Sequence, residues 1–146
     1  AAQSMPPSAA GSRSSDEGHP FGVPSRWQWT ALASIARIEM GQSPPSEHCN
    51  RSGTGMPFFQ GKADFGVHTP TPRYWCTQPT KIVQPGDILI SVRAPIGPTN
   101  IAAVECCIGR GLAGLRTREG VERDYLLVAL NALRRELEAI GFGAIF

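Results

Sequence analysis

The sequence is short of the patterns from which catalytic centres, metal sites and membrane spans are built. No stretch approaches the roughly 18 apolar residues that a membrane helix needs. Four cysteines occur without a CxxC pair, so no two of them show the close spacing of structural zinc sites. His48 stands beside Cys49, but no recognised nucleophile signature surrounds them. We therefore expect a non-catalytic protein with no metal, no cofactor of its own and no membrane partner.

The length and the cysteine content limit the number of domains and indicate the redox state of the thiols. A chain of 146 residues is long enough for one modest hydrophobic core and too short for two. Adjacent Cys106 and Cys107 cannot easily bridge each other, and no signal peptide opens the sequence. We therefore expect reduced thiols in a soluble, cytoplasmic protein with a single domain.

Charge is nearly balanced over the whole chain but not along it. Fourteen Lys and Arg residues against twelve Asp and Glu residues give a formal net charge of +2. From Arg51 to Arg118 there are eight basic residues and three acidic ones, a difference of +5. A surface that faces a polyanion requires such a local excess of cations. The alternative is a solvated surface on which these charges are scattered.

The first part of the chain differs in composition from the remainder. Residues 1–24 are rich in Ser, Ala, Gly and Pro and show almost no apolar periodicity, so we expect a disordered leader there. A folded domain is expected over residues 25–146. It opens with a short helix over residues 32–36 that Thr30 can cap, and a first strand follows over residues 37–40.

The domain is organised around residues 86–111, GDILISVRAPIGPTNIAAVECCIGRG. Residues 88–92 alternate with the period of a strand that has one buried face and one partly polar face. Two more strands are expected over residues 99–104 and 112–116, because Gly- and Pro-rich turns separate these β-prone runs. Three such strands predict the centre of one small sheet.

The C-terminal part predicts one long helix. Large apolar residues recur at helical spacing from Asp124 to Ile140, which gives the helix an apolar stripe that packs on the sheet. Asp124 is the expected N-cap and Gly141 the expected stop. Arg134 and Glu138 are four residues apart and are expected to pair on the solvated face.

The connections before residue 86 carry side chains of the kinds that contact nucleic acid. Residues 47–57 are expected to form a flexible loop with one cation, Arg51. Gln60 can bind adenine bidentately in the major groove, although a loop-stabilising amide is an equal alternative. Lys62 can pair with guanine or with a phosphate. Arg73 follows a Pro- and Thr-rich segment and is placed to contact a phosphate or to stack.

Two further arginines stand beside the organising strands. Arg93 is six residues from Asp87 on the same strand face, about 20 Å away, so these two cannot pair along the strand. Each needs another partner, and Arg93 is left either to anchor a loop or to reach a nucleic-acid backbone. Arg110, between two glycines, has the same alternatives. Those glycines are expected to permit tight turns rather than to cradle a phosphate.

Several of these segments occur together, in this order, in one known family. GQSPPSEHCN, GTGMPFFQGKADFG, YWCTQPTK, GDILISVRAPIG and IGRGLAGL resemble the target recognition domain of type I restriction-modification specificity subunits. The resemblance covers about residues 27–146 and stops before that family's last strand and spacer helix. It implies an α+β fold, a single target-recognition domain with a small, mostly antiparallel twisted sheet and flanking helices.

The resemblance also implies a function, the sequence-specific recognition of one half of a split target in double-stranded DNA. Methyltransferase (M) subunits would bind S-adenosylmethionine and methylate a flipped adenine, and a restriction (R) subunit would use ATP. Seven residues are the expected DNA contacts: Arg51, Gln60, Lys62, Arg73, Lys81, Arg93 and Arg110. Three alternatives stay open: the recognition portion of a fused restriction-methyltransferase, a protein-interaction module, and an inactive truncated remnant.

Overall fold

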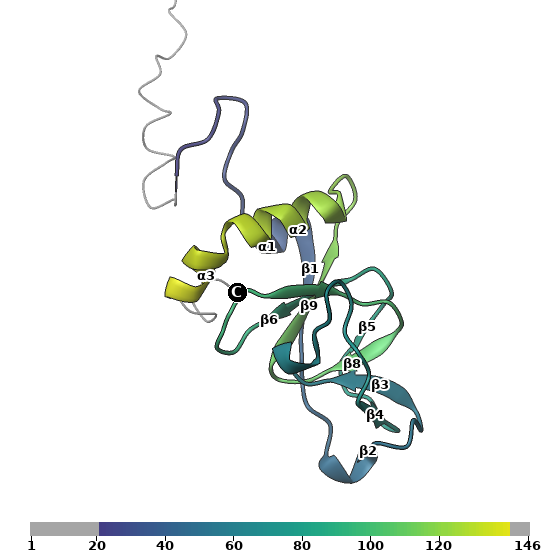
Figure 1. Cartoon of the computed structure of the whole chain (residues 1–146). Helices are drawn as coiled ribbons and strands as arrows, with labels where there is room; N and C mark the ends of the chain where they lie inside the picture. Colours follow the sequence, from purple (N-terminus) through teal and green to yellow (C-terminus); the bar gives the residue numbers. More distant parts are fainter. Residues whose placement is uncertain (1–20, 141–146) are drawn as a thin grey trace, which may run out of the picture. The chain divides into compact units, whose positions relative to one another are not determined.

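The computed structural model describes residues 21–140, which fall into two units. The first unit ends at Ala31, and its described residues, 21–31, form neither helix nor strand. Within it Phe21 packs edge to face on Trp29, with ring centroids 5.1 Å apart. The second unit begins at Leu32 and contains the described helices and strands (Figure 1). Most of the expected leader lies outside the described residues, as does the expected stop at Gly141.

The first sheet of the second unit has four antiparallel strands in the order β1-β9-β6-β7 (Figure 1). These strands are β1 (Ala36–Met40), β6 (Ile88–Ser91), β7 (Thr99–Ile101) and β9 (Leu112–Thr117). The three strands predicted around the organising stretch are confirmed, and they are neighbours. The strand predicted over residues 37–40 is β1, so the helix before it, α1 (Leu32–Ile35), is shorter than expected.

A second sheet has five strands in the order β2-β4-β3-β8-β5, so the predicted α+β fold with mostly antiparallel pairing is confirmed, with two sheets in place of the one expected. Its strands are β2 (Cys49–Asn50), β3 (Met56–Phe59), β4 (Tyr74–Cys76), β5 (Ile82–Val83) and β8 (Cys106–Ile108). Residues 47–57 are therefore not simply a flexible loop. They include part of a 3-10 helix, η2 (Ser46–His48), then β2 and the start of β3. Two-residue strands such as β2 are too short to show an alternating pattern.

Strand β6 is buried on both faces, whereas its sequence predicted one partly polar face. All four of its residues are buried, including Ser91, whose hydroxyl donates to the carbonyl oxygens of Arg93 and Pro95. Ile88 and Ile90 belong to the core cluster that contains the helical leucines. Leu89 belongs to the cluster that contains Ile108 and Val83 of the second sheet. The first sheet is thus a middle layer, and β6 is covered from both sides.

The predicted C-terminal helix is two helices, α2 (Arg123–Ala132) and α3 (Arg134–Ile140), with a break at Leu133. Glu122 is the N-cap, so the prediction of Asp124 was wrong; Asp124 lies in the first turn. The apolar stripe is confirmed, and its three buried leucines, Leu126, Leu130 and Leu137, join the first core cluster. The predicted pair of Arg134 and Glu138 is also present, with 3.5 Å between Nε and Oε1.

An ion pair between the buried Asp87 and the exposed Arg116 fixes the start of β6 to the end of β9. Arg116 donates from Nε to Oδ1 of Asp87 at 3.0 Å and from Nη2 to Oδ2 at 2.9 Å. The backbone N–H of Gln84 donates to the same carboxylate at 2.8 Å. This hydrogen bonding raises the pKa of the Arg116 guanidinium. Asp87 therefore has a partner other than Arg93, as the strand geometry predicted.

Candidate DNA-binding loops

Backbone hydrogen bonds bring three connections together at one end of the second unit. Gly111 donates to the carbonyl oxygen of Gln60 at 3.1 Å, and Val92 donates to that of Gly111 at 3.0 Å. These bonds join the β3–β4, β8–β9 and β6–β7 connections. We call these three connections the loop cluster; it carries five of the seven predicted contacts: Gln60, Lys62, Arg73, Arg93 and Arg110.

Two glycines of the loop cluster, Gly109 and Gly111, allow close approach rather than left-handed backbone. Neither Gly109 nor Gly111 has a positive φ. A Cβ on Gly109 would lie 2.9 Å from Oγ of Ser43, and one on Gly111 would collide with the carbonyl oxygen of Gln60. Gly109, Gly111 and Gly114 do have the spacing GxGxxG, but they lead into strand β9 and not into a helix. A dinucleotide-binding loop requires that helix, so the glycines serve packing here.

Asp64 holds two of the predicted DNA contacts, Gln60 and Arg73, in place. It is 3% exposed and belongs to the 3-10 helix η3 (Lys62–Asp64). Its Oδ1 accepts from Nε of Arg73 at 3.0 Å and from Nη2 at 2.7 Å, while its Oδ2 accepts from the backbone N–H of Gln60 at 2.7 Å. The hydrogen bonds and charge of Asp64 raise the pKa of Arg73. One buried carboxylate thus sets the position of both residues.

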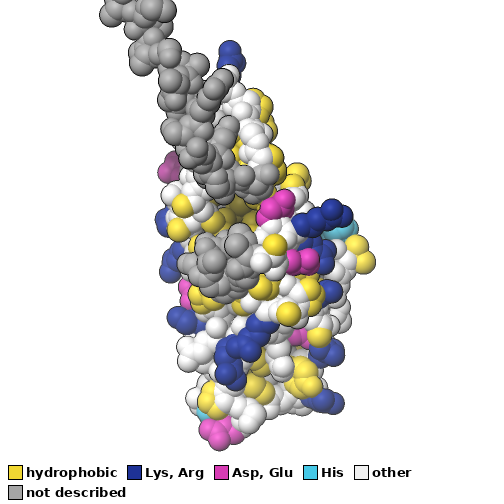
Figure 2. Space-filling model, turned by 90° about the vertical axis from the view of Figure 1, so that its left-hand side faces the viewer, with side chains coloured by type: hydrophobic (Ala, Val, Ile, Leu, Met, Phe, Trp, Pro, Cys, Tyr) yellow, Lys and Arg dark blue, Asp and Glu magenta, His cyan; other side chains and the backbone are white. Residues whose placement is uncertain are grey.

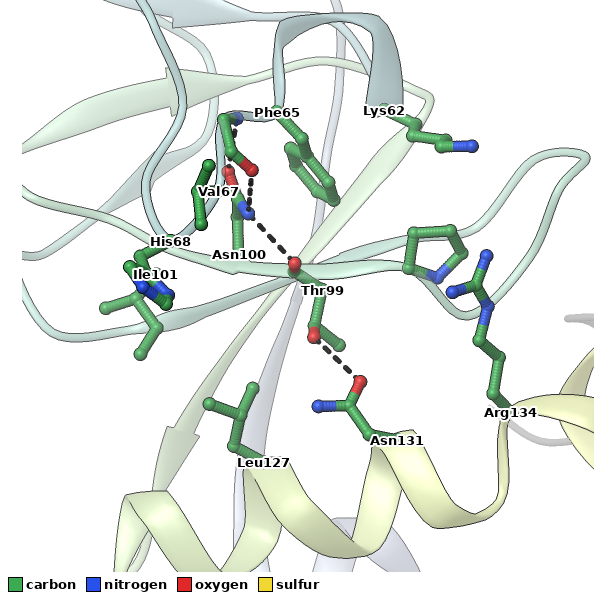
Figure 3. Close-up of a pocket in the computed structure, with 12 residues that line it drawn as sticks. Lys62, Phe65, Val67, His68, Thr99, Asn100, Ile101, Leu127, Asn131 and Arg134 are labelled. Carbon is green, nitrogen blue, oxygen red and sulfur yellow. Dashed lines mark hydrogen bonds between the residues drawn. The ribbon is translucent and has the colours of Figure 1, made fainter.

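Lys62 lines a pocket of about 390 Å³ between the loop cluster, β7 and α2. Figure 3 shows its side chain and that of Arg134 on the same side of this pocket. The pocket wall is anchored by Asn100, whose amide nitrogen donates to the carbonyl oxygen of Gly66 at 3.0 Å and whose oxygen accepts from Gly66 N–H at 3.0 Å. The segment after Lys62 is therefore tied to the first sheet.

Arg93 and Arg110 are exposed, and their charges are not compensated nearby. Within residues 21–140 no carboxylate lies at ion-pair distance from Lys62, Arg93 or Arg110. The backbone at Arg110 is fixed by a hydrogen bond of 3.2 Å from its N–H to Oγ of Ser43. Three free cations on anchored backbone are suited to contact an anionic backbone.

The remaining two predicted contacts, Arg51 and Lys81, lie apart from each other. Arg51 follows β2, at one edge of the second sheet, and Lys81 precedes β5, at the other edge. Four strand spacings separate these edges, about 19 Å. Arg51 donates to the hydroxyl of Tyr74 at 2.7 Å and lies over its ring, so its partner there is an aromatic side chain and not a carboxylate. Lys81 pairs with Glu39 at 3.3 Å, which reduces its attraction for an anion.

The surface charge of one face of the molecule is divided into separate groups. Figure 2 shows the Lys and Arg side chains of one face in several separate groups, with hydrophobic and neutral side chains between them. No broad continuous positive patch is visible among the described residues of that face. On that face, charge alone therefore does not mark a nucleic-acid surface among the described residues.

A β framework that holds free cations and an amide on adjacent loops is typical of a protein that recognises nucleic acid. Comparison with known proteins identifies the family within this class. The family described as "Type I restriction modification DNA specificity domain" matches residues 24–145, and this chain belongs to that family. The resemblance found in the sequence motifs is thereby confirmed.

Individual relatives agree with the family assignment. The chain is 44% identical, over 127 residues, to a Methanocaldococcus jannaschii protein named as a type I restriction enzyme MjaX specificity subunit. The match covers 85% of this chain and 30% of that protein. The solved HsdS subunit from Thermoanaerobacter tengcongensis is 53% identical with a TM-score of 0.77, over 88% of this chain and 34% of that chain.

One more distant structure is similar to this chain in fold only. A type I restriction-modification S subunit from M. genitalium has a TM-score of 0.59 at 17% identity, over 86% of this chain and 32% of that chain. The chain thus spans about a third of the length of the relatives that it matches.

The structure adds two residues that the sequence did not single out for the site, Asp64 and Asn100, and gives a new place to a third, Arg134. In the sequence Asp64 is only one acidic residue between Gln60 and Arg73. In the structure it accepts hydrogen bonds from both of them. Asn100 gives no signal, because its partner Gly66 is 34 residues away. The sequence favoured a solvated helix face for Arg134, with contact to a DNA backbone as the alternative, and the fold places it in the lining of the same pocket as Lys62.

Proposed function

We propose that this chain recognises a short sequence in double-stranded DNA through the loop cluster, as the specificity component of a type I restriction-modification system. The observation that carries the proposal is the convergence of five predicted contacts on connections joined by backbone hydrogen bonds. Membership of the family supports it. The domain would read one half of a split target, and it would perform no catalysis.

The proposed partners follow from the same role. M subunits would supply S-adenosylmethionine and methylate the DNA, and an R subunit would supply ATP-dependent restriction. One solved relative, 54% identical to this chain, comes from work on complex assembly and conformational transition of a type I restriction-modification system. A cytoplasmic location, where such a complex meets DNA, is part of the proposal. No helix among the described residues is long and apolar enough to cross a membrane.

The contact roles divide between phosphates and bases. Lys62, Arg93 and Arg110 are free cations and are assigned to phosphates, and Arg51 at the β2 edge of the second sheet is assigned to a phosphate as well. Arg73 is assigned to a base edge. Its guanidinium has five N–H donors, of which the contacts with Asp64 occupy two, so the others are available to a guanine. We leave Lys81 out of the contact set, because Glu39 pairs with it at the far edge.

Lys62→Ala is expected to weaken binding to every duplex and to lower the slope of log affinity against log salt by about 1, because one phosphate contact is lost. Arg73→Ala is expected to relax the preference at one base position, at a cost of about 1–3 kcal/mol there. Selection of bound duplexes from a randomised library at two salt concentrations measures both effects.

Lys81→Ala is the matched control for Lys62→Ala, since it removes the same side chain from a position where Glu39 already pairs with it. It should leave the salt slope within error of the parent protein. The assignment of Arg73 to a base would be wrong if both loop variants lost affinity uniformly over the library. The proposed function itself would be wrong if the parent protein selected no sequence.

A further inference from the structure

Cys49 and Cys76 face each other across strands β2 and β4. They are direct partners in the register of this antiparallel pair. The neighbouring partners, His48 and Thr77, are joined by a hydrogen bond of 3.0 Å from Thr77 N–H to His48 O. Hydrogen-bonded and non-hydrogen-bonded pairs alternate along such strands, so the two cysteines form a non-hydrogen-bonded pair, typically with about 4.5 Å between Cα atoms. Disulfides span Cα separations of roughly 4.4–6.8 Å.

The other two cysteines are excluded by their places in the sheet. Cys107 lies on β8, and β3 stands between β8 and β4. Two strand spacings, about 9.6 Å, exceed the Cα separation that a disulfide allows. Cys106 belongs to the core cluster on the other face of the second sheet, where burial raises the pKa of its thiol to about 12. Of the four free thiols, one pair alone has the placement that a disulfide needs.

We propose that Cys49 and Cys76 form a modification site, a dithiol that glutathione disulfide or a similar small disulfide oxidises to an intramolecular disulfide. Cys49 is half-buried and Cys76 is fully buried, so Cys49 is the point of attack. The Cys49 thiolate attacks one sulfur of glutathione disulfide and releases one glutathione thiolate. Cys76 then loses its proton and attacks the Cys49 sulfur, which releases the second glutathione.

The new bond would close the segment that carries most of the proposed DNA contacts. Residues 49–76 include Arg51, Gln60, Lys62 and Arg73. A disulfide stabilises chiefly by restricting the unfolded chain, and a loop of this length predicts a rise in the midpoint of thermal unfolding of about 10 °C. The modification site is independent of the proposed function, since neither the register nor the thiol chemistry involves DNA.

The test oxidises the purified chain with glutathione disulfide at about pH 8.5, because burial and the Cys76 thiol raise the pKa of Cys49 and slow the attack at neutral pH. Thiols are then counted under denaturing conditions, and tryptic peptides are mapped by mass spectrometry. The count is expected to fall from four to two, with the peptides of Cys49 and Cys76 joined.

Three variants give this test its controls. Cys76→Ser is expected to keep a glutathione on Cys49, and Cys49→Ser is expected to lose no thiol. Cys106→Ser is expected to form the same crosslink as the parent chain. A full complement of four thiols in the oxidised parent chain, or a crosslink that involves Cys107, would overturn the proposal; the peptide map of the parent chain decides this even where a variant does not fold.

Discussion

Asp64→Asn is expected to lower the free energy of unfolding by about 2 kcal/mol and to remove the preference of the chain for particular DNA sequences. The stability loss lies within the range for an unsatisfied buried donor. The carboxylate is buried and accepts three hydrogen bonds, two from Arg73 and one from the backbone of Gln60. An amide offers one acceptor in place of two, so a part-buried donor loses its partner, which costs about 1–3 kcal/mol. The Arg73 side chain is half exposed, so water can hydrogen-bond its guanidinium in the variant, and this limits the decrease in the free energy of unfolding.

The effect of Asp64→Asn on binding should exceed its effect on stability. Gln60 and Arg73 are both positioned by this carboxylate, so one substitution releases two residues of the loop cluster. Urea unfolding measures the stability, and library selection measures the preference. Asp124→Asn is the control, because the pair of Asp124 with Arg123 is exposed and contributes less than about 1 kcal/mol. A D64N chain that kept the parent's base preference would show that Asp64 does not position the readout.

Local pattern predicted the elements whose residues and partners are close in sequence. The strands β6, β7 and β9 are bounded by Gly and Pro and lie near one another along the chain, so their grouping in one sheet was predictable. The apolar stripe on residues 124–140 predicted which leucines are buried. The break at Leu133 was not predictable, because the spacing of the stripe continues across it and only packing against the sheet decides where the helix bends.

The second sheet was missed because its pairing is not local. Strand β3 lies between β4 and β8, so that Phe58 is the register partner of both Tyr74 and Cys107, which are far from it and from each other in the sequence. No sequence pattern encodes either partner. The burial of both faces of β6 follows from this second sheet, which is why a one-sided strand was expected.

The candidate site was predictable in its residue types and not in its grouping. Cations and an amide on Gly-rich connections indicated Gln60, Lys62, Arg93 and Arg110 directly. Their convergence depends on the contacts of Gly111 with neighbouring connections, which the sequence does not show. Lys81 had the same local signature as Lys62, and only the fold reveals that Glu39 pairs with it.

Gly41→Ala is expected to destabilise the chain by about 3 kcal/mol or more, the range of severe backbone clashes. A Cβ at this position would collide with the carbonyl oxygen of Gly109 and lie 2.6 Å from that of Leu112. Gly41 donates to Leu112 at 3.0 Å, and Gln42 donates to Ile108 at 3.0 Å. Relief of the clash therefore separates residues 41–42 from the β8–β9 connection and breaks hydrogen bonds on both of its sides.

This connection carries Arg110 and joins the loop cluster, so Gly41→Ala should also weaken DNA binding under conditions in which the chain stays folded. Gly61→Ala is the matched control: its Cβ would meet nothing nearer than Cα of Gly111 at 4.0 Å, and its φ of −178° suits any residue. That control should unfold within about 0.5 kcal/mol of the parent chain in urea. If Gly41→Ala unfolded at the same urea concentration as Gly61→Ala, the close contact of residue 41 with this connection would not exist in solution, and neither would its support of Arg110.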